Sequence, residues 1–176
     1  HHKSTNAHRC DKYTSGGGWA ANSVELIHPR IHASSVVMDS GDIYMLGGEF
    51  SSITSEILKK GANVWTAGPD LVYGISGACA VTLNSNSFVV IGSGWNHTKV
   101  NAYNTQTETW SADWTDLKEG TKGHACATVD KWIVIAGGYS FTYNEYIAHT
   151  RIMDSVTMVV TSHTAMNYKR AFFSMQ

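Results

Sequence analysis

Short apolar runs that end in glycine recur along this chain of 176 residues. They read IYMLGG at 43–48, FVVIGSG at 88–94 and IVIAGG at 133–138. Gly, Asn, Asp and Ser surround these runs, a pattern that is typical of strands and hairpins. No segment keeps a 3.6-residue apolar period over three turns, so the pattern predicts almost no helix.

The spacing of these runs is nearly constant. Their last glycines, Gly48, Gly94 and Gly138, are 46 and 44 residues apart, and Trp65 and Trp110 are 45 apart. Self-similarity at a period of 40–50 residues indicates a repeat architecture in which each repeat is one supersecondary unit. The repeat therefore overrides the division into one or two ordinary domains that the length alone would suggest.

Within each repeat the alternation of apolar runs and turn residues predicts four strands. The three repeats are expected at about 30–71, 75–117 and 122–165. The predicted strands are 32–37, 43–46, 55–58 and 64–65, then 78–83, 88–91, 99–103 and 109–111, then 125–129, 132–136, 146–153 and 157–160.

The two ends predict parts of further repeats. Residues 1–15 are expected to be irregular, and 16–28 to be a partial repeat with a glycine turn at 16–19 and a third strand at 23–27. Residues 169–176 are expected to contain the opening strand of another repeat, because Arg170–Ser174 aligns with Arg30–Ser34.

Residues 16–176 resemble the kelch repeat. The matching residues are Gly47-Gly48 with Trp65, Gly94 with Tyr103 and Trp110, and Gly137-Gly138 with Tyr146. The chain departs from the kelch pattern at Ser93, inside the second glycine pair, and in the third repeat, which lacks the tryptophan.

The resemblance implies an all-β kelch-type β-propeller, in which each repeat forms one four-stranded antiparallel blade. A blade has two apolar faces, so neighbouring blades must pack around an axis. The glycines are expected to pass beneath the rings of Trp65 and Trp110, where a Cβ would clash.

Three blades plus partial terminal blades would leave apolar faces open, because propellers close with four to eight blades. Either segments outside this sequence or a second copy would complete the ring, and the short N-terminal repeat favours missing segments. In a third arrangement, Arg170–Ser174 pairs with the N-terminal blade and closes a small ring.

Charge and composition exclude several classes of partner. The formal net charge is −1 and 15% of residues are charged, which argues against binding to nucleic acid or to an anionic membrane. The longest apolar runs are about five residues, too short to span a bilayer.

Candidate binding residues lie in two classes of loop that the kelch resemblance places on one face of a propeller. Binding residues concentrate on such loops, and aromatic side chains are common interface anchors. The alternative is that these side chains fold back onto their own blade. The candidates are Phe50, Tyr73, Trp95, Tyr139, Phe141 and Tyr143.

A glycosylation sequon, Asn96-His97-Thr98, occurs in one of these loops, so a secreted protein would carry a glycan at Asn96. The sequon favours an extracellular glycoprotein. An odd cysteine count and a polar N-terminus without a signal peptide leave a cytoplasmic location open.

Cys79 and Cys126 are expected to be a pair of buried free thiols, while Cys10 could pair elsewhere. Cys79 and Cys126 are assigned to the repeat position of Ser34, and adjacent blades rarely bring two Cα atoms within the roughly 7 Å that a disulfide needs. Cys10 lies in the segment expected to be irregular. The histidines show no HxH or HExxH spacing, so neither a metal nor any other cofactor is expected.

These observations predict a non-enzymatic module that binds a protein or glycan partner. A structural subunit whose copies join through blade edges, as a homo-oligomer, is the alternative. A copper radical oxidase is the weaker third hypothesis, because Tyr13 near Cys10 and scattered histidines supply the residue types without a motif.

Overall fold

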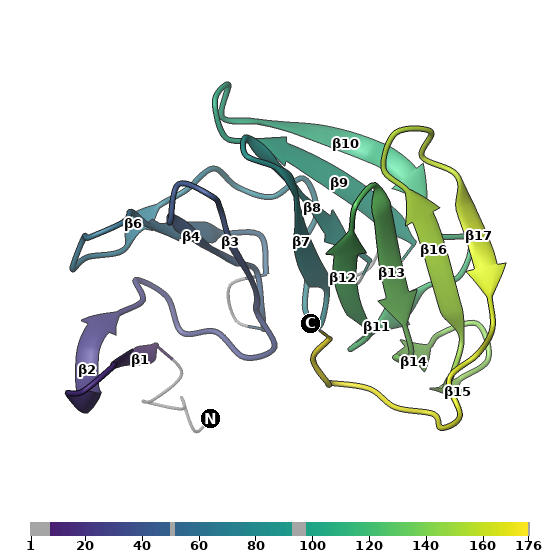
Figure 1. The fold of residues 1–176 in the computed structure, drawn as a ribbon, viewed down its shortest axis with the longest axis horizontal. Coiled ribbons are helices and arrows are strands. Elements are labelled where there is room, and N and C mark those ends of the chain that lie inside the picture. The colour runs from purple at the N-terminus through teal and green to yellow at the C-terminus, as the bar shows by residue number, and fades with distance from the viewer. Residues whose placement is uncertain (1–7, 50–51, 93–97, 176) are drawn as a thin grey trace.

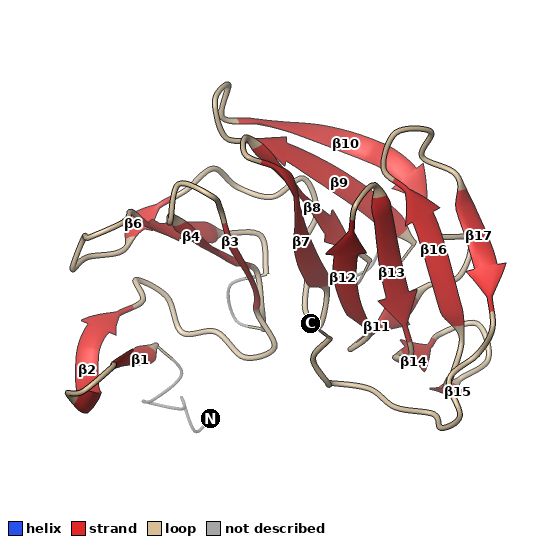
Figure 2. Cartoon of the chain, viewed as in Figure 1, coloured by secondary structure: helices blue, strands red, loops and turns tan. Residues whose placement is uncertain are grey.

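The computed structural model describes residues 8–49, 52–92 and 98–175, and within these ranges it contains strands and no helix (Figure 2). Strands β3 to β6, β7 to β10, and β12, β13, β16 and β17 form three four-stranded antiparallel sheets. A hairpin, β1–β2, and a small sheet, β11-β14-β15, complete the described part. The described residues include no helix long and apolar enough to cross a membrane.

The first sheet is Ser34–Val37 (β3), Ile43–Leu46 (β4), Ser55–Leu58 (β5) and Thr66–Ala67 (β6). The second is Cys79–Asn84 (β7), Ser87–Ile91 (β8), Lys99–Asn104 (β9) and Thr109–Asp116 (β10). The third is Ala125–Val129 (β12), Trp132–Ala136 (β13), Thr150–Asp154 (β16) and Val160–His163 (β17). The remaining strands are Arg9–Thr14 (β1), Gly18–Glu25 (β2), Thr121–Lys122 (β11), Tyr139–Ser140 (β14) and Glu145–Tyr146 (β15).

The three sheets stand side by side with β3, β7 and β12 innermost (Figure 1). Side chains bond one inner strand to the backbone of the next. The Ser34 hydroxyl donates to the Ala78 carbonyl at 2.7 Å, and the Thr128 hydroxyl donates to the Thr82 carbonyl at 3.1 Å. The described residues form an open array of sheets and not a closed ring.

The expected strands 43–46, 55–58, 125–129 and 132–136 are confirmed. The expected strand 146–153 is instead two, β15 and β16, and they belong to different sheets. A break after Tyr146 lets the chain leave the small sheet before it joins the third.

The structure revises the glycine alignment. Gly47, Gly92 and Gly137 each end a second strand with a positive φ, and each is 45 residues from the next. The equivalent of Gly48 is therefore position 93, not Gly94.

The expectation that these glycines pass beneath tryptophan rings is wrong for the first and third repeats. A Cβ at Gly47 would overlap Ile75, and one at Gly138 would lie 2.9 Å from the Lys122 carbonyl oxygen. The glycines thus let the inter-sheet linkers approach the backbone closely.

The expectations for the N-terminal segment are also corrected. Residues 1–15 include a strand, β1, and 16–28 contain β2, which pairs with it. Tyr13 lies opposite Trp19 as Tyr103 lies opposite Trp110. The hairpin therefore matches the outer two strands of a four-stranded sheet, and Trp19 extends the tryptophan series.

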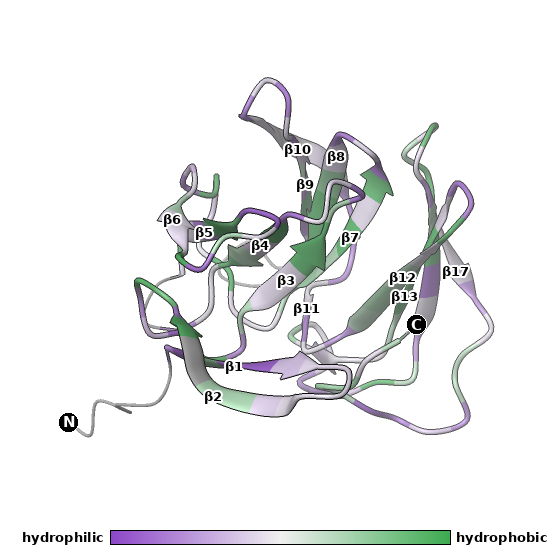
Figure 3. Cartoon of the chain, turned by 60° about the vertical axis from the view of Figure 1, so that its left-hand side comes forward, coloured by the Kyte–Doolittle hydropathy of each residue, from purple (hydrophilic) through white to green (hydrophobic). Residues whose placement is uncertain are grey.

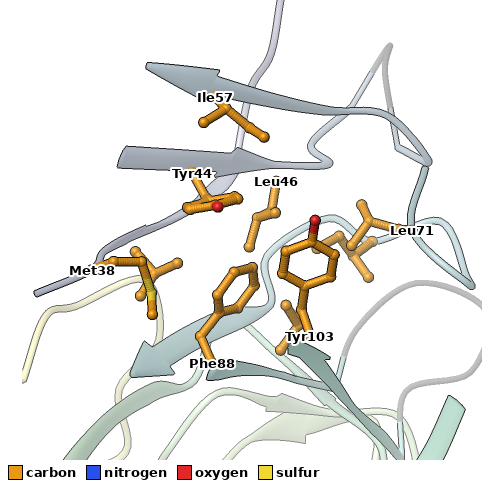
Figure 4. Close-up of a cluster of buried hydrophobic side chains, with 10 residues drawn as sticks. Met38, Tyr44, Leu46, Ile57, Leu71, Phe88 and Tyr103 are labelled. Carbon is orange, nitrogen blue, oxygen red and sulfur yellow. The ribbon is translucent and has the colours of Figure 1, made fainter. Parts of the chain in front are cut away.

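Two buried clusters fill the spaces between the sheets. Side chains alternate between the two faces of a strand, so each sheet contributes one set of positions to each neighbour. Tyr44 and Leu46 of β4 meet Phe88 and Tyr103 of the second sheet (Figure 4). β8 is apolar along most of its length, while β1 is mainly hydrophilic (Figure 3).

The second cluster lies between the second and third sheets. It joins Val89 and Ile91 of β8 to Ile133 and Ile135 of β13, all of which are almost fully buried. Burying such a side chain stabilises the fold by about 1.5–3 kcal/mol.

Backbone hydrogen bonds connect the starts of the sheets in a series that we call the hub ladder: His32, Gly77, Gly123 and Phe172. The Gly77 amide donates to the His32 carbonyl at 2.8 Å, Gly123 donates to Gly77 at 2.6 Å, and Phe172 donates to Gly123 at 2.6 Å. All four residues have a positive φ, between 54° and 68°.

The C-terminal segment 169–175 ends at this ladder and contains no strand, so the expected opening strand is wrong. Arg170–Ser174 does not pair with the N-terminal hairpin either. Instead the Arg170 carbonyl accepts from the Gly138 amide at 2.8 Å, and the Phe172 ring lies 4.9 Å from the His32 ring. The segment packs across the shared centre of the sheets.

Cys79 and Cys126 form a disulfide with a Cα–Cα distance of 6.0 Å, so the expectation of free thiols is wrong for this pair. Cys79 lies opposite Ile91, as Ser34 lies opposite Leu46. Cys126 lies opposite Ile135, one residue beyond that repeat position. A shift of one residue turns a side chain to the other face of its strand, so Cys126 faces the second sheet and meets Cys79.

Replacing both cysteines with serine, C79S/C126S, is expected to lower the free energy of unfolding by about 2–4 kcal/mol, because the bond links residues 47 positions apart. Urea unfolding without reductant measures the change. Cys10, a free thiol, supplies the control variant C10S, which should stay within about 0.5 kcal/mol of the wild type. Equal stability of C79S/C126S and the wild type would contradict the assignment.

Candidate functional site

The small sheet β11-β14-β15 holds three of the expected binding residues together. The linker strand β11 pairs with β14, so that Lys122 lies opposite Tyr139. β14 then pairs with β15, so that Tyr139 lies opposite Tyr146. The loop between β14 and β15 carries Phe141 and Tyr143, and the Phe141 amide donates to the Gly120 carbonyl at 3.1 Å.

Three rings of this sheet form a surface that we call the aromatic platform: Tyr139, Phe141 and Tyr146. The Tyr139 ring contacts Phe141 at 5.7 Å and Tyr146 at 5.4 Å, both edge to face. Lys122 Nζ lies 5.8 Å from the centre of the Phe141 ring. Phe141 is 41% exposed and Tyr146 is 54% exposed, so the platform presents ring surface and a cation to the solvent.

Next to the platform is a polar cavity of about 280 Å³. Tyr143 connects the two features, because it follows Phe141 in the loop and also lines the cavity. Its ring meets the ring of His149 edge to face at 5.7 Å. The wall also includes Glu119, His149, Thr150, Arg151 and His163.

A hydrogen bond joins His149 and Glu119 at the cavity wall, with 3.1 Å between His149 Nδ1 and Glu119 Oε2. The other carboxylate oxygen, Glu119 Oε1, is buried without a hydrogen-bond partner among the described residues. Glu119 comes from the linker before β11, while His149 directly precedes β16. The cavity therefore lies where an inter-sheet linker meets the third sheet.

Arg151 attaches this linker to β16. Its guanidinium donates to the Glu119 carbonyl at 2.9 Å and to the Thr121 hydroxyl at 3.0 Å. Arg151 is 4% exposed, and its Nε has no partner among the described residues. Burial lowers the pKa of Arg151, and the nearby Glu119 opposes this shift.

In the first sheet, a side chain of the opposite charge attaches the preceding linker to the sheet. Glu56 occupies the position in β5 that Arg151 occupies in β16. Its carboxylate accepts from the Ile27 amide at 2.7 Å and pairs with Arg30 at 2.7 Å. An acceptor at this position holds linker N–H groups, whereas Arg151 holds a linker carbonyl.

His124 completes the hydrogen-bond network around Thr121. Its Nδ1 lies 3.1 Å from the Thr121 hydroxyl, and its Nε2 lies 3.0 Å from the Ile91 carbonyl oxygen. Burial, reinforced by the positive charge of Arg151, lowers the pKa of His124 to about 4. His124 is therefore neutral at pH 7, in a structural position.

The remaining expected binding residues fall elsewhere. Tyr73 is half-buried on the linker between β6 and β7, between the buried Leu71 and Ile75. Phe50, Trp95 and the sequon residue Asn96 lie outside the described residues.

No motif in the sequence indicates the polar part of this site. Glu119 lies in an expected loop, but its partners His149 and Arg151 are 30 and 32 residues away, with no motif spacing. Tyr146 was placed in a strand, where its exposure was not apparent. Lys122 lies in the same expected loop as Glu119.

These groups supply apolar surface and hydrogen-bonding side chains. Exposed rings offer flat apolar surface, and the cavity adds a carboxylate, a guanidinium, imidazoles and hydroxyls. Across residues 8–49, 52–92 and 98–175, no group of three or more His, Cys, Asp or Glu side chains is placed to hold a metal ion.

The chain matches no protein-family model, and no curated protein sequence matches it.

Acid is expected to destabilise the protein through His124. Its pKa is about 4 in the folded state and about 6.5 in the unfolded state, so the unfolded chain binds more protons between these values. The stabilising contribution is complete above pH 6.5, and about 3 kcal/mol is lost as the pH falls to 4.

Urea unfolding at several pH values measures this slope in the wild type and in H124Q, in which the slope should be smaller. The exposed His163 gives the control H163Q, which should keep the wild-type slope. An unchanged slope in H124Q would show that His124 is not the responsible group.

Proposed function

We propose that this chain is a stretch of a kelch-type β-propeller that acts as a non-enzymatic binding module for a protein or glycan partner. The repeat supports the kelch type: a glycine after each second strand, a period of 45 residues, and tryptophans at Trp19, Trp65 and Trp110. Packing of four-stranded antiparallel sheets around a common centre is consistent with propeller blades.

The observation that carries the binding function is the aromatic platform. Large rings are normally buried or folded against their own sheet, yet Phe141, Tyr143 and Tyr146 are between 41% and 58% exposed within one hairpin. Rings that contact one another hold their positions before a partner arrives, which reduces the entropy lost on binding. Aromatic residues are also the most frequent residues to dominate binding energy at interfaces.

Alanine at Phe141 and Tyr146 tests this function. The double variant F141A/Y146A should bind at least tenfold more weakly than the wild type to the ligands that a printed glycan array and an array of extracellular protein domains reveal. The matched control is Y168A, which removes a tyrosine that is 74% exposed outside the platform. Binding that F141A/Y146A retains in full, with the same thermal unfolding as the wild type, would refute the platform as the binding surface.

A second candidate function, joining copies of the chain, is favoured by the ring pair on the β1–β2 hairpin. Tyr13 and Trp19 are 60% and 74% exposed and contact each other at 5.3 Å. At the same repeat positions, Tyr103 and Trp110 pack against the first sheet. The Tyr13–Trp19 pair is thus exposed to solvent, whereas a neighbouring sheet covers the equivalent pair, Tyr103 and Trp110.

Sedimentation velocity over a range of concentrations tests this second function. The wild type is expected to associate as its concentration rises, and Y13A/W19A is expected to remain monomeric, because the variant lacks the rings that would be buried. Y168A again serves as the control. A wild type that stays monomeric at high concentration would rule out association through this hairpin.

A further inference from the structure

We infer that the polar cavity beside the aromatic platform binds one ring of a neutral, hydroxyl-rich ligand, that is, a single sugar residue of a glycan. This inference rests on the proposed binding function and names the ligand class for the same surface. At about 280 Å³ the cavity is slightly smaller than the 300–1,000 Å³ of typical small-molecule sites, which suits a single sugar ring.

The balance of charge at the wall selects a neutral ligand. The wall contains one carboxylate, Glu119, and one guanidinium, Arg151, so their formal charges cancel. A phosphate or carboxylate ligand would meet the Glu119 carboxylate, and an ammonium ligand would meet the Arg151 guanidinium. A ligand that donates and accepts hydrogen bonds without net charge satisfies both groups.

The unpaired atoms of these two residues call for such a ligand. Glu119 Oε1 can only accept a hydrogen bond and Arg151 Nε can only donate one, and both are buried without partners among the described residues. Leaving a buried polar group unpaired is unfavourable, because the group has lost its hydrogen bonds to water. Both residues line the cavity, so a small shift of either side chain would let neighbouring hydroxyls of a sugar ring, which donate and accept at one oxygen, serve both residues.

The ring of Tyr143 supplies the apolar part of the site. It is 58% exposed at the cavity and is held edge to face by His149, which is itself paired with Glu119. Sugar rings have an apolar C–H face that packs on an aromatic ring, while their edges carry the hydroxyls. Tyr143 also continues into the platform, so further sugar residues of the same glycan would lie over Phe141 and Tyr139.

The test uses the whole chain on a printed glycan array, followed by titration with the best-bound glycan and with its free terminal monosaccharide. Wild-type binding is expected to weaken at least tenfold in E119Q, because an amide cannot replace the anionic acceptor. T150V, which removes one wall hydroxyl at nearly constant volume, is expected to weaken binding by a smaller factor. Thermal unfolding confirms that each variant is folded.

A second readout reports on the cavity directly. His149 contacts both Glu119 and Tyr143, so its imidazole NMR signals are expected to shift when the monosaccharide is added to the wild type, and to stay unchanged in E119Q. S52A is the control variant, because Ser52 lies on the loop before β5, in the first sheet, and is exposed.

The possible outcomes separate this inference from the proposed function. Glycan binding that is lost in F141A/Y146A but kept in E119Q would overturn the cavity and leave the platform standing. Binding only to arrayed protein domains, with no glycan bound, would overturn the sugar ligand. Binding that E119Q weakens and F141A/Y146A leaves intact would support the cavity and refute the platform.

Discussion

The structure depends on one constraint: both apolar faces of the second sheet, one toward the first sheet and one toward the third, must be covered. Strand alternation meets it by directing Tyr44 and Leu46 toward the second sheet, and Val89 and Ile91 toward the third. Each sheet thus serves as the core of its neighbour. Because no sheet is covered on both faces without the next, the repeat can be stable only as a side-by-side array.

The linkers must then run between the sheets without separating them. The hub ladder bonds the linkers to one another at His32, Gly77, Gly123 and Phe172. Within the third sheet, Arg151 and His124 hold the linker that carries Glu119 and Thr121. This attachment also builds the candidate site, because it places Glu119 beside His149 and positions β11 to receive β14.

The aromatic part of the candidate site was predictable, whereas the polar part was not. Tyr139, Phe141 and Tyr143 follow a glycine pair and lie in one predicted loop, so their closeness in the sequence already brings them together. Glu119 and Arg151 are 32 residues apart and meet only because a linker crosses the end of a strand. Their interaction follows from how the linker packs against the sheet, which no local pattern encodes.

The sequence by itself determined the period, the strand-forming runs and the all-β class. Alternation of apolar and polar residues, and glycines that end strands, act within a few residues and can be recognised locally. Only the tertiary structure decided how those strands combine. Cys126 lies one residue beyond the repeat position of Cys79, so its side chain faces Cys79 and the two form a disulfide. Alignment of the repeats had predicted free thiols instead. Likewise β1 is a strand because it pairs with β2. Arg170–Ser174 pairs with no strand among the described residues and packs at the hub ladder instead. Strand pairing and cross-sheet contact depend on which neighbours are close in space, and that information is absent from any short stretch of sequence.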